Sequence, residues 1–138
     1  MEEKKENTKT IGERTQGIVL ASLLKNGKIV LLPFGDNQRY DLAVDDNGTF
    51  SRIQCKTARV INNGDAIAFE TASSYAHRGG NKKHYRGEAD YFGVYSPYTG
   101  KVYLIPVSEV GLTQCVLRLN PTGNKQTIGV RWAKDFEI

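Results

Sequence analysis

Near the N-terminus of this chain, one segment has apolar residues that recur at the spacing of a long helix. The pattern runs over residues 11–23. Asn26-Gly27 then supplies residues that typically end a helix. We therefore predict a helix from about Ile11 to Lys25. The residues that follow must fold mainly by pairing short strands.

Short strand-like runs, separated by turn residues, follow the predicted helix. We expect strands at residues 28–32, 39–44, 49–57, 66–71, 91–95, 102–107, 116–119 and 128–132, and a short helical turn near 108–110. Asn47-Gly48 is a strong hairpin signal between the second and third strands. One helix leading into hairpin-rich strands is typical of the α+β class. The length of 138 residues fits one domain, which we place at residues 10–138 after a frayed tail over residues 1–9.

The third predicted strand carries a row of polar side chains. Side chains of a strand alternate between its two faces, so Arg52, Gln54 and Lys56 share one face. Ile53 and Cys55 point the other way, toward the expected core. A polar row that ends in a lysine, on a strand with an apolar back, is unusual unless a function uses it.

A tight hairpin at residues 45–48 would bring Asp41 roughly opposite Gln54. A carboxylate, an amide oxygen and the Lys56 ammonium group would then converge. Mg²⁺ prefers oxygen ligands of this kind, with water and substrate phosphate completing its shell. A lysine beside it can orient an attacking water molecule and offset phosphate charge. This pattern indicates metal-assisted phosphodiester chemistry.

Four longer segments resemble one family of proteins. They are residues 31–42, 54–57, 73–80 and 91–95. They resemble the small PD-(D/E)XK endonuclease family that includes a group I intron-encoded homing endonuclease, and the similarity extends from about Gly12 to the C-terminus. The resemblance implies a restriction-endonuclease-like core, with the helix packed on a mixed, mostly antiparallel sheet. It also implies Mg²⁺-dependent cleavage of double-stranded DNA, with Mn²⁺ as a substitute metal, by a homodimer or homotetramer.

The resemblance assigns four catalytic residues. Asp41 corresponds to the principal metal ligand, and Gln54 to a metal ligand or ligand-supporting amide. Lys56 corresponds to the residue that positions the attacking water, and Glu13 to a helical acid that binds the metal or its water. An alternative for Glu13 is structural, because Thr10-x-x-Glu13 also has the pattern of a capping box at the start of the helix.

Two positions depart from the usual family pattern. Tyr40 replaces the proline before the aspartate, and Gln54 replaces an acidic residue, which removes one negative charge from the metal site. We expect weaker metal binding or loss of a second metal. Two other functions remain open: a structure-selective nuclease resembling Holliday-junction resolvases, and a non-catalytic DNA-binding module with the nuclease fold. A plain structural or interaction protein is a further alternative.

The stretch from Ala72 to Gly87 is polar, basic and rich in glycine. Its cationic residues could neutralise phosphates, while hydroxyl groups fix the register on the duplex. The residues that we expect to bind DNA are Ser73, Ser74, Tyr75, His77, Arg78, Lys82, Lys83 and Arg86. The alternative is a solvated loop. The net charge of +4 suits a polyanionic partner but is weak evidence by itself.

Neither a membrane span nor a signal peptide is expected. No apolar run approaches the ~18 residues that a membrane helix needs, and the N-terminal residues are charged. We therefore expect a cytoplasmic protein without a membrane partner. In that reducing compartment, Cys55 and Cys115 would be free thiols.

Overall fold

Helix α1 (Thr8–Lys25) is followed by ten short strands in the part of the chain that the structure describes. The structure is a computed structural model and describes residues 5–74 and 82–138. The strands are β1 (Ile29–Leu31), β2 (Leu42–Asp46), β3 (Thr49–Thr57), β4 (Arg59–Ile61), β5 (Ala66–Glu70), β6 (Ala72–Ser74), β7 (Lys82–His84), β8 (Tyr91–Ser96), β9 (Lys101–Pro106) and β10 (Gln114–Arg118). Three short 3₁₀ helices lie at Asn62–Gly64, Val107–Glu109 and Ala133–Asp135.

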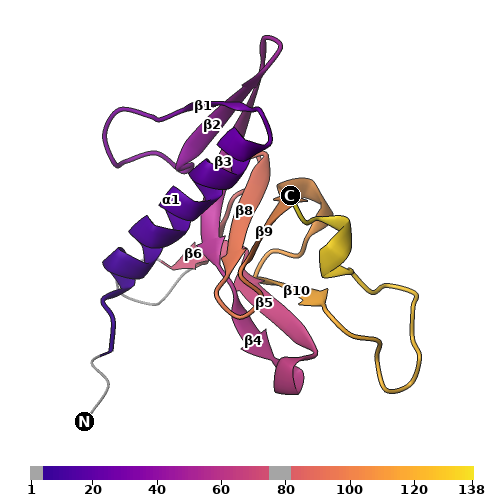
Figure 1. The fold of residues 1–138 in the computed structure, drawn as a ribbon. Coiled ribbons are helices and arrows are strands. Elements are labelled where there is room, and N and C mark those ends of the chain that lie inside the picture. Colours follow the sequence, from indigo (N-terminus) through magenta and orange to yellow (C-terminus); the bar gives the residue numbers. More distant parts are fainter. Residues whose placement is uncertain (1–4, 75–81) are drawn as a thin grey trace.

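The main sheet has five strands in the order β1-β2-β3-β8-β9. Strands β3 and β8 are parallel, whereas the other neighbours in this sheet are antiparallel. Helix α1 crosses one face of this sheet (Figure 1). A second sheet, in the order β10-β5-β4, packs on the other face through a shared apolar cluster. The α+β class and the mixed, mostly antiparallel sheet predicted from the sequence are thereby confirmed.

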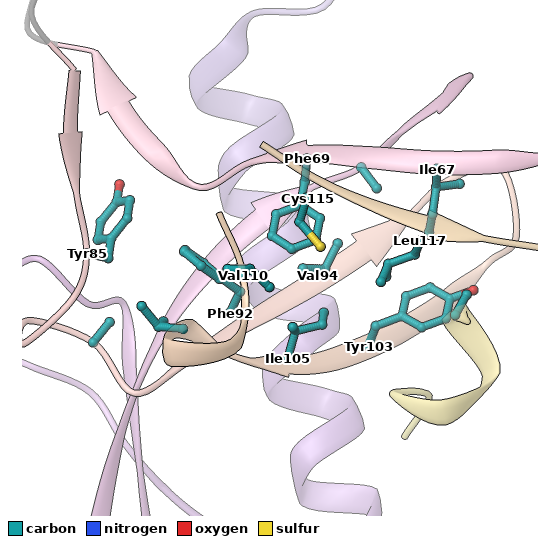
Figure 2. Packing of buried hydrophobic residues seen from close by; sticks show 14 residues of the cluster. Ile67, Phe69, Tyr85, Phe92, Val94, Tyr103, Ile105, Val110, Cys115 and Leu117 are labelled. Atoms are coloured by element: carbon teal, nitrogen blue, oxygen red, sulfur yellow. The ribbon is translucent and has the colours of Figure 1, made fainter. Parts of the chain in front are cut away.

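Two apolar cores hold these layers together. One lies under α1 and includes Val19 and Ile53, with Cys55 packed against it. The other lies between the two sheets and includes Phe69 and Phe92, whose rings meet edge to face at 5.5 Å (Figure 2). Strand β3 therefore has an apolar face toward the helix, as its alternating sequence predicts.

Gly93 in β8 allows α1 to approach the sheet closely. A Cβ atom at this position would lie 2.7 Å from Cγ1 of Val19 and 3.0 Å from Cγ2 of Ile53. We expect Gly93→Ala to lower the free energy of unfolding by about 1–3 kcal/mol, as overpacking of a core does. Urea unfolding monitored by circular dichroism measures the change.

Gly12 provides the matched control for that substitution. It is exposed on α1, and a Cβ atom there would meet nothing within 4 Å. Gly12→Ala should leave stability unchanged or raise it by up to about 1 kcal/mol, because alanine favours helix. Equal unfolding midpoints for the two variants would contradict the packing explanation.

The start of α1 differs from the prediction. The helix begins at Thr8, and Asn7 is its N-cap, with Oδ1 accepting a hydrogen bond from the backbone N of Lys9 at 2.8 Å. Thr10 and Glu13 therefore lie inside the helix, and the capping-box interpretation of Glu13 is wrong. The end of the helix follows the prediction, with Asn26 as C-cap and Gly27 at a φ of 75°.

Strand predictions also change. Strands β4, β6 and β7 were not predicted, and the strand predicted at residues 116–119 is Gln114–Arg118. Strand β2 begins at Leu42 rather than at residue 39, because Asp41 ends the ladder in the way described below. The strand predicted at residues 128–132 does not form. Gly129 has a positive φ of 75°, and pairing there is limited to a bridge between Trp132 and Arg118.

In the described ranges, no helix is both long enough and apolar enough to cross a membrane.

Candidate active site where strands β2 and β3 separate

Strand β3 changes partners along its length. Its first half, up to Ile53, pairs with β2, and its second half, from Ile53, pairs in parallel with β8. Asp41 lies at the point where β2 separates from β3. Its backbone N donates to the Ile53 carbonyl at 2.9 Å, and its Oδ2 accepts from the backbone N of Cys55 at 2.9 Å. The carboxylate thus accepts a hydrogen bond that the carbonyl of a paired strand would otherwise accept. It is held at the point where β2 and β3 separate, which we call the fork.

The register of the hairpin places Asp41 across from Gln54. The ladder ends with the pair Leu42 and Ile53, and Asp41 directly precedes β2 while Gln54 directly follows Ile53 in β3. The carboxylate is also close enough to Lys56 for the ammonium charge to act on it. The structure therefore places Asp41 beside the part of β3 that carries Gln54 and Lys56.

Burial makes the Asp41 carboxylate costly to ionise. Its pKa is raised because it is partly removed from water, although the Cys55 N–H and the Lys56 charge lower it in part. The pKa of the Cys55 thiol is also raised, first by burial and then by Asp41, so this thiol stays protonated. Carboxyl groups with raised pKa values beside a positive group are typical of functional sites.

Gln54 and Lys56 are half-buried on β3. The Gln54 Nε2 atom donates to the Cys55 carbonyl at 3.4 Å, which leaves the amide oxygen as the acceptor end of this side chain. The Lys56 Nζ atom donates to the hydroxyl of Tyr85 at 3.2 Å. Gln54 thereby keeps its amide oxygen, and Lys56 keeps two ammonium hydrogens, for other partners.

Helix α1 is fastened to this end of β3 by polar contacts. The hydroxyls of Thr15 and Thr57 are 2.6 Å apart, and Gln16 Nε2 donates to the Asp41 carbonyl at 3.3 Å. Glu13 is exposed and precedes Gln16 by three residues, so the two side chains project from the same side of the helix. The approach of Glu13 to Asp41 stays a prediction.

Arg52, the third member of the predicted polar row, has a structural role. Its Nε and Nη2 atoms contact the Asp90 carboxylate at 3.2 and 3.3 Å, and its Nη1 donates to the Gly87 carbonyl at 3.0 Å. This pairing lowers the pKa of Asp90. Arg52 therefore fixes the loop before β8 and is separate from the Asp41 group.

Arg39 is a connecting residue that the sequence analysis placed at the start of the predicted strand 39–44. Its Nε contacts Glu88 Oε2 at 2.6 Å, and its Nη1 donates to the hydroxyl of Ser73. Its Nη2 donates to the carbonyls of Lys83 and His84 at 3.1 and 2.8 Å. The guanidinium group links the segment before Asp41 to the β6–β7 hairpin. No local sequence signal indicates this, because the partners are at least 34 residues away.

Of the residues predicted to bind DNA, Tyr75, His77 and Arg78 fall outside the described residues. Ser74 belongs to β6, and Lys82, in β7, is exposed. The others make contacts within the protein. These are Ser73 with Arg39, Lys83 with Glu88 at 3.0 Å, and Arg86 with the Val110 carbonyl at 2.8 Å.

The donor atoms at the fork suit a hard cation. Within residues 5–74 and 82–138, no group of three or more His, Cys, Asp and Glu side chains could hold a metal ion. A cation at the fork would therefore depend on the Asp41 carboxylate together with the neutral oxygen of Gln54. Oxygen donors with few charges fit Mg²⁺, which usually retains water in its shell.

Comparison with known proteins agrees with this architecture. The sequence matches the family described as PD-(D/E)XK endonuclease over residues 6–138. The fold is similar to the solved structure of the bacterial homing endonuclease I-Ssp6803I. The TM-score is 0.75 at 23% sequence identity, over 96% of this chain and 89% of that chain. No curated protein matches the sequence at a significant level. The predicted restriction-endonuclease-like fold is confirmed.

Proposed function

Because this chain belongs to the PD-(D/E)XK endonuclease family, we propose that it hydrolyses phosphodiester bonds of double-stranded DNA. The observation that carries the proposal is the Asp41 carboxylate, held where β2 and β3 separate, across from Gln54 and within the electrostatic influence of Lys56. A buried carboxylate, an amide oxygen and an ammonium group at one point suit the cleavage of a phosphodiester.

Asp41, Gln54 and Glu13 would hold Mg²⁺, or Mn²⁺ in its place. The ion would stabilise the charge that develops on the phosphate and lower the pKa of a bound water molecule. Gln54 contributes no charge, so the electrostatic attraction for the cation would come from the Asp41 and Glu13 carboxylates. The Lys56 ammonium group orients the attacking water and offsets negative charge on the phosphate.

The partners follow from the substrate. The exposed Lys82 and the other cationic residues predicted to bind DNA would contact phosphates beside the cleaved bond. A cut through both strands requires two active sites, so we expect a homodimer or homotetramer. DNA as substrate and two cysteines without a disulfide bond both fit a protein that acts inside the cell.

Cleavage of a randomised library of linear duplexes tests the proposal. We expect cleavage with Mg²⁺ or Mn²⁺ and none with EDTA, and sequencing of the ends reports any site preference. A four-way junction, offered in competition, should be cut no faster than linear duplex. A preference for the junction would replace homing-like cleavage by structure-selective cleavage.

DNA binding without cleavage would contradict nuclease activity. Salt-sensitive DNA binding that persists in EDTA, without cleavage under any divalent metal, would indicate a non-catalytic DNA-binding module. The neutral Gln54 is the feature that favours this alternative. Absence of DNA affinity at low salt would exclude both functions.

A further inference from the structure

Tyr85 lies directly after β7 and contacts Lys56 in two ways. Its hydroxyl accepts a hydrogen bond from the Lys56 Nζ at 3.2 Å, and the same nitrogen lies 4.8 Å from the centre of the ring. The side chain is only 4% exposed, and Figure 2 shows it at the edge of the core cluster, beside Phe92. Lys56 therefore meets a buried aromatic hydroxyl on the face of β3 that carries the site.

Tyr85 is itself held firmly. Its ring meets Phe92 edge to face at 5.6 Å with an interplanar angle of 89°. The Arg39 guanidinium group lies over the ring, 3.9 Å from its centre. The backbone carbonyl accepts hydrogen bonds from the N atoms of Glu88 and Ala89 at 2.9 and 3.0 Å. A hydroxyl fixed from several sides provides a rigid point of attachment.

A neighbouring carboxylate offsets the charge of the second cation at the Tyr85 ring. Arg39, the other cation at the ring, forms an ion pair with Glu88 at 2.6 Å. Lys83 also pairs with Glu88, and the two cations lower the pKa of that carboxyl. The charge of Arg39 is thereby offset, and its repulsion of the Lys56 ammonium group is reduced.

We propose that Tyr85 is a positioning residue for Lys56, holding the ammonium group toward Asp41 and the reacting phosphate. A lysine side chain has four rotatable bonds and loses considerable rotamer entropy when it is held in one place. A catalytic group must be placed to within about 0.5 Å, which requires support from neighbouring side chains. The hydroxyl accepts from one of the three ammonium hydrogens and leaves two for water or phosphate. This inference rests on the proposed nuclease activity.

Removal of the hydroxyl alone tests this role. Tyr85→Phe keeps the ring and its packing against Phe92 and Arg39. We expect the single-turnover rate of DNA cleavage to fall about tenfold, the order expected for loss of a hydrogen bond to a charged group. The dissociation constant for DNA and the thermal midpoint should stay close to those of the wild type, because the core is preserved.

A double-mutant cycle separates positioning from a purely structural effect. If Tyr85 acts through Lys56, Tyr85→Phe should cause no further loss of rate in a Lys56→Met background, measured over hours at saturating enzyme. Tyr103→Phe is the matched control. It removes another buried hydroxyl, which donates to Thr99 Oγ1 at 3.0 Å, and should leave the cleavage rate unchanged.

Two results would overturn the positioning role. One is a wild-type rate for Tyr85→Phe, and the other is the same tenfold loss with and without Lys56. If the wild-type protein cuts no DNA under any divalent metal, the proposed function itself fails, and the role of Tyr85 in cleavage fails with it. The wild-type reaction, run in parallel, distinguishes the two failures.

Discussion

Asp41→Asn is expected to lower the rate of DNA cleavage by about 10³-fold, the order of loss when a group that stabilises charge is removed from an active site. Asparagine has nearly the same shape as aspartate, and its carbonyl oxygen can still accept the hydrogen bond from the Cys55 N–H. The substitution therefore removes the negative charge and preserves the end of the β2–β3 ladder. Single-turnover cleavage of a duplex substrate with saturating Mg²⁺ measures the effect.

The same substitution should leave the protein as stable as the wild type, or more stable, at neutral pH. The folded-state pKa of Asp41 is raised above its ordinary value, mainly by burial. The ionised carboxylate is therefore penalised in the folded state, and this penalty is fully present above the raised pKa. As the pH falls through that pKa toward the unfolded value, the carboxyl becomes protonated and the penalty disappears.

Thermal unfolding over a pH series checks this sign. The midpoint of Asp41→Asn should exceed that of the wild type most at neutral pH, and the difference should shrink on acidification. Asp46→Asn is the control, since Asp46 lies at the tip of the hairpin, more than half exposed and 4.0 Å from Lys28. Its cleavage rate should match the wild type. Wild-type cleavage by Asp41→Asn would refute the metal-site assignment.

The hairpin that builds the site could be predicted from local sequence. Strand β3 has the predicted bounds, Thr49–Thr57, because its alternating pattern directly follows Asn47-Gly48. Both turn residues adopt the positive φ values, 53° and 89°, that favour Asn and Gly. Once the turn is located, counting along an antiparallel pair places Asp41 across from Gln54.

The first residue of the helix was harder to predict. Asn7 and Thr10 are both good N-cap residues, and one turn of helix separates them. The apolar pattern begins at Ile11 and contains no information about the preceding turn, which is polar whether or not it is helical. The capping-box spacing to Glu13 favoured the later start, whereas the backbone uses the earlier cap.

The contacts around Lys56 could not be predicted from a single sequence. Tyr85 lies 29 residues beyond Lys56, and Glu88 lies 49 residues beyond Arg39. No periodicity relates a strand to a residue after a distant hairpin. These contacts also depend on the parallel pairing of β3 with β8, which brings the residues just before β8 next to β3.

Lys56→Met is expected to lower the cleavage rate by about 10²–10³-fold, the loss typical when one group that stabilises transition-state charge is removed. Methionine retains an unbranched apolar chain that can pack on the ring of Tyr85. Binding to DNA should weaken little, because a single phosphate contact among many changes the salt dependence by a slope of at most about one. The effect should therefore appear in the rate at saturating DNA.

For Lys82→Met we expect the opposite result, with weaker DNA binding and a retained cleavage rate. Lys82 is exposed on β7 and belongs to the surface proposed to contact phosphates. Its loss should weaken DNA binding and reduce the salt slope by about 0.9, with the single-turnover rate retained at saturating enzyme. If Lys56→Met instead behaved like Lys82→Met, Lys56 would be a phosphate contact and not a group that acts on the reacting water. The different outcomes expected for these two lysines separate chemistry from binding in two different sheets of one small protein.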